Sequence, residues 1–191
     1  SLKTDSAGRV YAVTKTSNST LDPSQPLIQL LLRQPGGAWS TDVVGLVSDS
    51  NTRAILELDA AASVLHVFMT GEHTTGGGGQ GGGDIFEKTS LASPISFPAG
   101  AGTTVIRDEN SNGLNNATST KQNLNATTGT IVLAFNDDTN VYCPHRQVPT
   151  VPPLPPAAAF TGPRRTGSSH PRATLPNPSP GHAPPPHPPA F

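Results

Sequence analysis

The chain of 191 residues carries 12 Lys and Arg against 13 Asp and Glu, which gives a formal net charge of −1. Neither this balance nor its distribution is strong enough to predict binding to nucleic acid or to an anionic membrane surface. A single cysteine, Cys143, excludes a disulfide within the chain, and no apolar run approaches the length of a membrane-spanning helix.

The composition changes near Val148. The last 44 residues hold 15 of the 21 prolines and no Asp or Glu, and they offer little apolar surface. Such a composition is typical of a disordered, low-complexity segment. We therefore expect a proline-rich tail over residues 148–191 and a folded part over residues 1–147.

The stretch from Thr52 to Asp108 is the clearest structured region. It contains four short runs rich in β-branched and apolar residues, and turn-forming residues separate each run from the next. The predicted strands are 52–59, 64–71, 83–90 and 103–108. Four consecutive antiparallel strands form one unit of the kind that builds a blade of a β-propeller.

The same plan occurs before and after this stretch. The first unit has predicted strands at 1–5, 9–17, 26–33 and 40–47, and the third has strands at 117–125, 130–137 and 141–145. The apolar run at 26–33 also fits a helical turn, although Pro26 and the Pro35-Gly36-Gly37 turn favour a strand.

The three units share a strand, polar turn, strand pattern, and Lys-Thr-Ser occurs at both Lys15 and Lys88. Internal repetition of this kind is typical of propellers and solenoids. We therefore predict an all-β fold: a partial β-propeller of about two and a half four-stranded antiparallel blades. The predicted blades are residues 1–51, 52–108 and 115–147.

A glycine-rich segment, residues 76–83, separates two strands of the second unit. Seven glycines in eight residues predict a flexible insertion at a hairpin tip. A phosphate-binding loop is the alternative, but no helix signal follows and the lysine that such loops use is missing.

Several segments resemble a known family. The sequence RQPGGAWS, which ends at Ser40, is similar to a degenerate Asp-box (bacterial neuraminidase repeat), in which Gly37 and Trp39 match while the serine, aspartate and threonine do not. GRVYAVTKTS, NTRAILELD, HVFMTGE, IFEKTS, ISFPAGAGTTVIRD and NNATSTKQN are similar to secreted bacterial proteins that contain a sialidase-like β-propeller. The resemblance covers roughly residues 1–145.

The resemblance implies the C-terminal part of a propeller domain whose ring of six or seven blades needs further blades upstream. It also implies an extracellular or cell-surface location, although this chain carries no signal peptide. PPLPPAAAFTG resembles the linker to a PKD domain, with its aborted start at residues 157–162. Beyond Gly162 the similarity ends. The arginine- and proline-rich sequence that follows is typical of translation in the wrong reading frame.

The candidate binding residues follow from the propeller hypothesis. The first strand of each blade lines the central channel of a propeller, which places Lys3, Arg53 and Lys121 around a ligand-binding funnel. Arginines in sialidases grip a carboxylate in this way. The alternative is that the three cations are solvated or pair with Glu57 and Asp59. By the Asp-box resemblance, Trp39 is expected to be the buried structural anchor of the first blade.

Catalysis and metal binding receive less support from the sequence. Acid–base hydrolysis needs two facing carboxylates roughly 5–10 Å apart, and the available acids are assigned to strand ends and turns. The three histidines outside the tail (His66, His73 and His145) lack the spacing of metal ligands. Asn136-Asp137-Asp138 fits a hairpin turn better than a Ca²⁺ loop. We expect no catalytic residue, no metal and no cofactor.

Three readings of function remain open. The favoured one is a fragment of a secreted or surface propeller that binds glycans or an extracellular polymer, with self-association through its open blade faces. The second is the scaffold of a sialidase-like glycoside hydrolase. The third is a truncated or frame-shifted reading frame without activity of its own.

Overall fold

The computed structural model describes residues 1–18, 22–73, 83–109, 113–125 and 128–147. These residues confirm the all-β class, because they form three antiparallel sheets and a single short 3-10 turn, η1 (Val47–Asp49). The described residues contain no helix with the length and apolar character that crossing a bilayer requires. The predicted tail over 148–191 lies outside the described residues.

The first sheet contains β1 (Leu2–Thr4), β2 (Val10–Lys15), β3 (Pro26–Arg33) and β4 (Trp39–Leu46), hydrogen-bonded in that order. The β1–β2 turn forms because the Asp5 carboxylate accepts hydrogen bonds from the backbone N–H groups of Ala7 and Arg9 and because Gly8 adopts φ +79°. The apolar run at 26–33 is a strand, as its proline and glycine flanks predicted.

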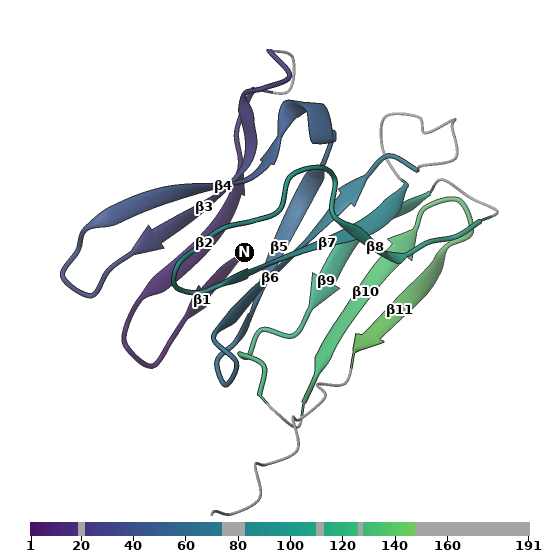
Figure 1. The fold of residues 1–191 in the computed structure, drawn as a ribbon. Coiled ribbons are helices and arrows are strands. Elements are labelled where there is room, and N and C mark those ends of the chain that lie inside the picture. Colours follow the sequence, from purple (N-terminus) through teal and green to yellow (C-terminus); the bar gives the residue numbers. More distant parts are fainter. Residues whose placement is uncertain (19–21, 74–82, 110–112, 126–127, 148–191) are drawn as a thin grey trace, which may run out of the picture. The chain divides into compact units, whose positions relative to one another are not determined.

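The second sheet contains β5 (Thr52–Asp59), β6 (Val64–Gly71), β7 (Asp84–Leu91) and β8 (Thr103–Ile106), again in chain order. Asp59 closes the β5–β6 hairpin by accepting hydrogen bonds from the backbone N–H groups of Ala61 and Ala62. β8 pairs with β7 only as far as Glu87, and residues 92–102 then cross beside the remainder of β7 (Figure 1).

The third sheet contains β9 (Leu114–Ser119), β10 (Thr130–Asn136) and β11 (Val141–Gln147) in the order β11-β10-β9. The predicted strand at 117–125 is misplaced in the sequence. β9 begins at Leu114, since Leu114 and Asn115 are buried and pair with Asn136 and Phe135, and it ends at Ser119.

Two apolar clusters lie between the sheets. The cluster between the first and second sheets has 13 buried residues, whereas the cluster between the second and third has seven. Alternation along β5 and β6 supplies both, because Leu56 and Val67 face the first sheet while Ile55 and Phe68 face the third. With about 1.5–3 kcal/mol for each fully buried large apolar side chain, the third sheet is held less strongly than the first.

The expected anchor role of Trp39 is corrected. Trp39 is 60% exposed, and it is the first residue of the edge strand β4, opposite Arg33. Alternation explains its position: Leu32 faces the core, so the adjacent pair formed by Arg33 and Trp39 lies on the opposite face of the sheet.

The propeller hypothesis predicts an open apolar face at each end of the chain. The residues expected there are Val10, Val13, Leu30 and Leu32 in the first unit and Ile131, Leu133 and Phe135 in the third. Val13, Leu30 and Leu32 were expected on an open face, but they are buried in the larger apolar cluster. At the other end Ile131 and Leu133 on β10 are exposed by 44% and 36%, whereas Phe135 is half-buried.

Candidate functional site

Polar side chains gather where strands of the second and third sheets begin or end on the same side. β6 and β10 finish there, and β5, β7 and β9 begin there. We call this group the strand-end cluster; its members are Arg53, His73, Asp84, Arg107, Asp108, Asn115, Asn136 and Asp137. Asp84, Asn115 and Asn136 are buried, and the side chain of His73 is only 7% exposed.

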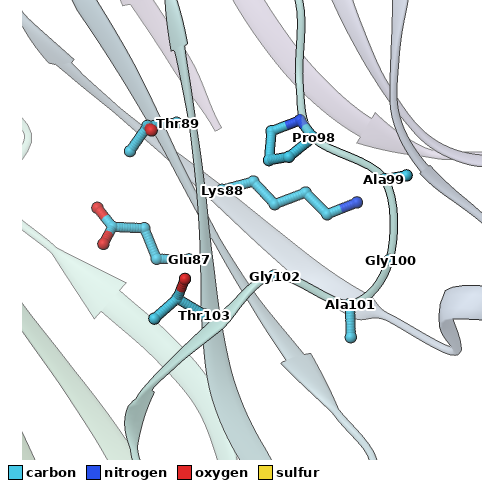
Figure 2. Close-up of a pocket in the computed structure, with 9 residues that line it drawn as sticks. All are labelled: Glu87, Lys88, Thr89, Pro98, Ala99, Gly100, Ala101, Gly102 and Thr103. Carbon is cyan, nitrogen blue, oxygen red and sulfur yellow. The ribbon is translucent and has the colours of Figure 1, made fainter.

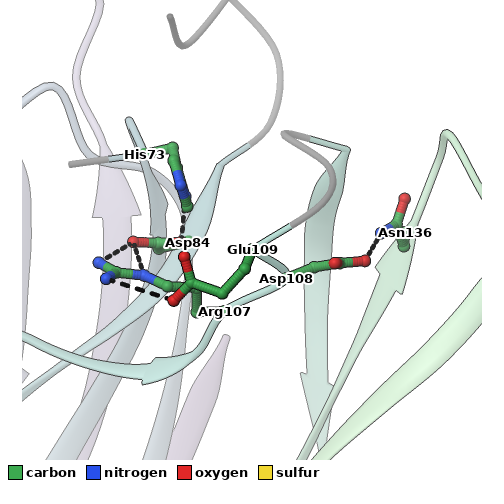
Figure 3. A network of polar contacts seen from close by, with 6 residues as sticks. All are labelled: His73, Asp84, Arg107, Asp108, Glu109 and Asn136. Carbon is green, nitrogen blue, oxygen red and sulfur yellow. Dashed lines mark hydrogen bonds and ion pairs between the residues drawn. The ribbon is translucent and has the colours of Figure 1, made fainter. Parts of the chain in front are cut away.

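Asp84 is the centre of one half of the cluster (Figure 3). Its Oδ1 lies 2.8 Å from Nδ1 of His73, and its Oδ2 accepts hydrogen bonds from Nε and Nη2 of Arg107 at 3.0 and 2.7 Å. Because a carboxylate only accepts, Nδ1 is the protonated nitrogen of His73. The hydrogen bonds to Asp84 also raise the pKa of the Arg107 guanidinium. A fully buried carboxylate thus fixes the orientation of the His73 and Arg107 side chains.

Asn136 holds the other half. Its Nδ2 donates to Oδ2 of Asp108 at 2.7 Å, and its Oδ1 accepts from the backbone N–H groups of Asp138 and Thr139. Gly113 permits this close approach, since a Cβ at this position would lie 2.6 Å from the Asn136 amide oxygen. The β10–β11 turn is therefore fixed by its own first side chain, in the manner of an Asx turn.

Two irregular strand starts also belong to this end of the sheets. Arg53 and Asn116 adopt φ +51° and +48°, and each lies where a strand pairing shifts in register. Nη1 of Arg53 donates to Oδ1 of Asn115 at 2.6 Å, and Nδ2 of Asn115 donates to Asp137 at 3.2 Å. Left-handed backbone at non-glycine residues is costly and often found at functional sites.

The three predicted channel cations do not converge. Arg53 reaches Asn115 near the start of β9, while Lys121 follows the end of β9. The six residues of β9 separate these two positions by about 20 Å at ~3.3 Å per residue. Lys121 is exposed and lies outside any strand, which also corrects its expected place on a first strand.

Lys3 is a structural cation rather than a channel lining. It is 4% exposed, and its ammonium donates to the backbone carbonyls of Thr120, Lys121 and Gln122 at 2.9, 3.0 and 3.2 Å. Burial lowers the pKa of Lys3, and the nearby Glu57 partly offsets this effect. The first strand of the chain is thereby tied to the segment that follows β9.

A second candidate is a cleft of about 450 Å³ between β7 and the loop before β8 (Figure 2). It is lined by residues 87–89 and 98–103. Its two charged groups are already engaged, since Lys88 donates to the Val44 carbonyl and to Asp49, and Glu87 contacts His66. The strand-end cluster is the better candidate because Arg107 and Asp137 keep an exposed part.

The histidines and acids take roles that the sequence did not assign. His66 and His73 each contact a carboxylate, at 2.7 and 2.8 Å, on separate parts of the second sheet. No group of metal-ligating side chains is found within the described ranges. Glu57, expected near a strand end, lies inside β5 and is fully buried.

Sequence reasoning missed Asp84 and Arg107. Asp84 is the first residue of β7, directly after the glycine-rich segment, and Arg107 follows the short strand β8. Both fall within the predicted strands at 83–90 and 103–108, where a charged residue carries no sign of a distant partner. Their pairing depends on the β7–β8 register, which places Ile85 opposite Ile106. The one available signal is an aspartate at the start of an apolar strand. Comparisons of the chain with protein-family models, curated proteins and solved structures find no match.

Proposed function

We propose that this chain belongs to an extracellular or surface β-propeller that binds glycans or a related hydroxyl-rich polymer, and that its three sheets are consecutive blades. The strand-end cluster is the binding surface in this proposal. The supporting observation is the buried carboxylate of Asp84, which holds Arg107 and His73 in fixed orientations beside the Asn115 and Asn136 amides.

The chemistry of the cluster suits hydroxyl groups. Carboxylates accept hydrogen bonds, side-chain amides both accept and donate them, and guanidinium groups donate two in parallel. Side chains that are held by buried partners lose little conformational entropy when a ligand binds.

An aromatic surface lies at the same end. Tyr142 is 63% exposed at the start of β11, and its ring packs at 5.2 Å against Phe135, opposite it on β10. An exposed tyrosine offers an apolar ring face and a polar hydroxyl to one ligand. A sugar ring has both kinds of surface, which supports glycans over purely ionic polymers.

The blade hypothesis is supported by the stacking of the sheets. The first strands of neighbouring sheets lie close together. β1 and β2 of the first sheet contact β5 of the second, and β5 contacts β9 of the third. A parallel bridge between Asp59 and Leu124 continues the same arrangement. Sheets of four antiparallel strands that meet through their faces are the building plan of a propeller.

Binding is tested with the purified 191-residue chain on immobilised sialylated glycans, uronic-acid polysaccharides and neutral glucans. We expect retention on at least one class and a loss of at least fivefold in affinity for Tyr142→Ala. Trp39→Ala is the matched control, since Trp39 is a similarly exposed aromatic at the opposite end of the strands. Absence of binding to every class, or loss of binding in the Trp39 variant alone, contradicts the proposal.

A further inference from the structure

Three titratable side chains interrupt the apolar face of the second sheet that meets the third. Glu57 on β5 is paired across the strands with His66 on β6, and Nδ1 of His66 lies 2.7 Å from Oε1 of Glu87 on β7. Apolar residues such as Ile55 and Phe68 surround this row on the same face. Charged groups in such an interface weaken it unless they are paired.

Glu57 is the least compensated of the three. Its side chain is fully buried, and among the described residues neither carboxylate oxygen has a hydrogen-bond partner. Burial raises the pKa of Glu57, and the neighbouring Glu87 acts in the same direction. Ser119, Lys3 and His66 lower the pKa of Glu57 by smaller amounts. The Ser119 hydroxyl lies near the carboxylate, but its geometry is not that of a hydrogen bond.

The charged groups around Glu57 come from only some of the elements that pack on it. β1 contributes Lys3, β6 contributes His66 and β7 contributes Glu87. β9 contributes no titratable side chain, since its sequence is LNNATS. The ammonium of Lys3 is held by the three carbonyls of residues 120–122 and makes no direct ion pair with Glu57. Its charge therefore compensates an ionised Glu57 only in part.

We propose that Glu57 is a proton-binding site that controls how firmly the third sheet packs on the second. A protonated Glu57 is neutral and can remain between the two sheets. An ionised Glu57 needs water or a new donor, which it reaches only when β9 and β10 separate from the second sheet. Few apolar residues oppose this separation, because the cluster between these sheets has seven buried members.

The direction of the pH dependence follows from proton linkage. The packed state binds the Glu57 proton more tightly than the opened state, in which the carboxyl returns to its ordinary pKa near 4.5. The contribution of this proton is complete below that pKa and is lost as the pH rises through the raised pKa of the packed state. One proton changes the opening equilibrium by at most about tenfold per pH unit in that window.

Hydrogen–deuterium exchange tests the proposal on the whole chain. Protection factors of the β9 and β10 amides, corrected for the intrinsic pH dependence of exchange, are measured from pH 5 to pH 8. We expect them to fall as the pH rises, by more than threefold over this range, while the amides of β2 and β3 change less. Glu57→Gln, which carries no titratable proton, should remove the decrease.

Glu72→Gln is the matched control, because Glu72 is an exposed acid directly after the end of β6. It should retain the wild-type profile. The proposal is overturned if β9 and β10 in the wild type show no such decrease, a result that needs no variant to fold. It is also overturned if Glu57→Gln keeps the wild-type profile, since His66 or another group then carries the pH dependence.

Discussion

Replacement of Lys3 by methionine should destabilise the protein far more than an ordinary surface substitution. Methionine keeps the length and the apolar stem of lysine but removes the ammonium. The carbonyls of Thr120, Lys121 and Gln122 then lose a donor at 2.9, 3.0 and 3.2 Å. Glu57 also loses its nearest cation.

The magnitude follows from these contacts. A hydrogen bond to a charged group contributes roughly 1.5–3 kcal/mol, and three that share one ammonium contribute less than three times this amount. Burial of the ammonium opposes them, as the lowered pKa of Lys3 indicates. We expect a net loss of about 2–4 kcal/mol in the free energy of unfolding.

Urea unfolding, followed by far-ultraviolet circular dichroism, measures this loss at pH 7. Lys15→Met is the control, since Lys15 is an exposed lysine on the adjacent strand β2 and should change stability by no more than about 0.5 kcal/mol. The double variant with Glu57→Gln should lose less than the two single variants together, because it removes both members of a coupled pair. Equal stabilities of the Lys3 and Lys15 variants would refute the reasoning.

Two further outcomes are expected. Gly102→Ala should lower the free energy of unfolding by about 2–3 kcal/mol in thermal unfolding, because Gly102 has φ +106° and a Cβ there would lie 2.6 Å from the Glu87 carbonyl oxygen. Gly36→Ala is the control, since Gly36 has open space around it, and it should change stability by less than about 0.5 kcal/mol. Similar effects of the two substitutions would contradict this. The purified chain should self-associate through the exposed face of β10, and Leu133→Lys should shift it toward the monomer in size-exclusion chromatography with light scattering; a monodisperse wild-type monomer would argue against open blade faces.

The strands could be predicted from the sequence because their limits are chemically marked. Pro26, Asp59 and the glycines of the turns end or start a strand for local reasons, and the structure places strands at most of the expected positions. β9 was misplaced since Asn115 and Asn116 read as turn residues. In the structure, Asn115 is buried and contacts Arg53 on β5 and Asp137 in the β10–β11 turn, both distant in sequence.

The site residues were harder to predict. Alternation shows which side chains share a face of a strand, but it does not show whether another sheet covers that face. Glu57 alternates with Leu56 and Leu58 and therefore reads as solvent-facing, yet the third sheet buries it. Trp39 shows the reverse case, in which an aromatic that suggested a core position lies on an uncovered edge.

The Lys3 contact has a consequence for folding during synthesis. Its three carbonyl partners lie 117 to 119 positions further along the chain. β1 can pair with β2 as soon as both have left the ribosome, but the ammonium stays without these partners until Gln122 has also emerged. At about 5–20 residues per second, this delay lasts roughly 6–24 seconds. β1 is therefore made well before its last stabilising contacts can form.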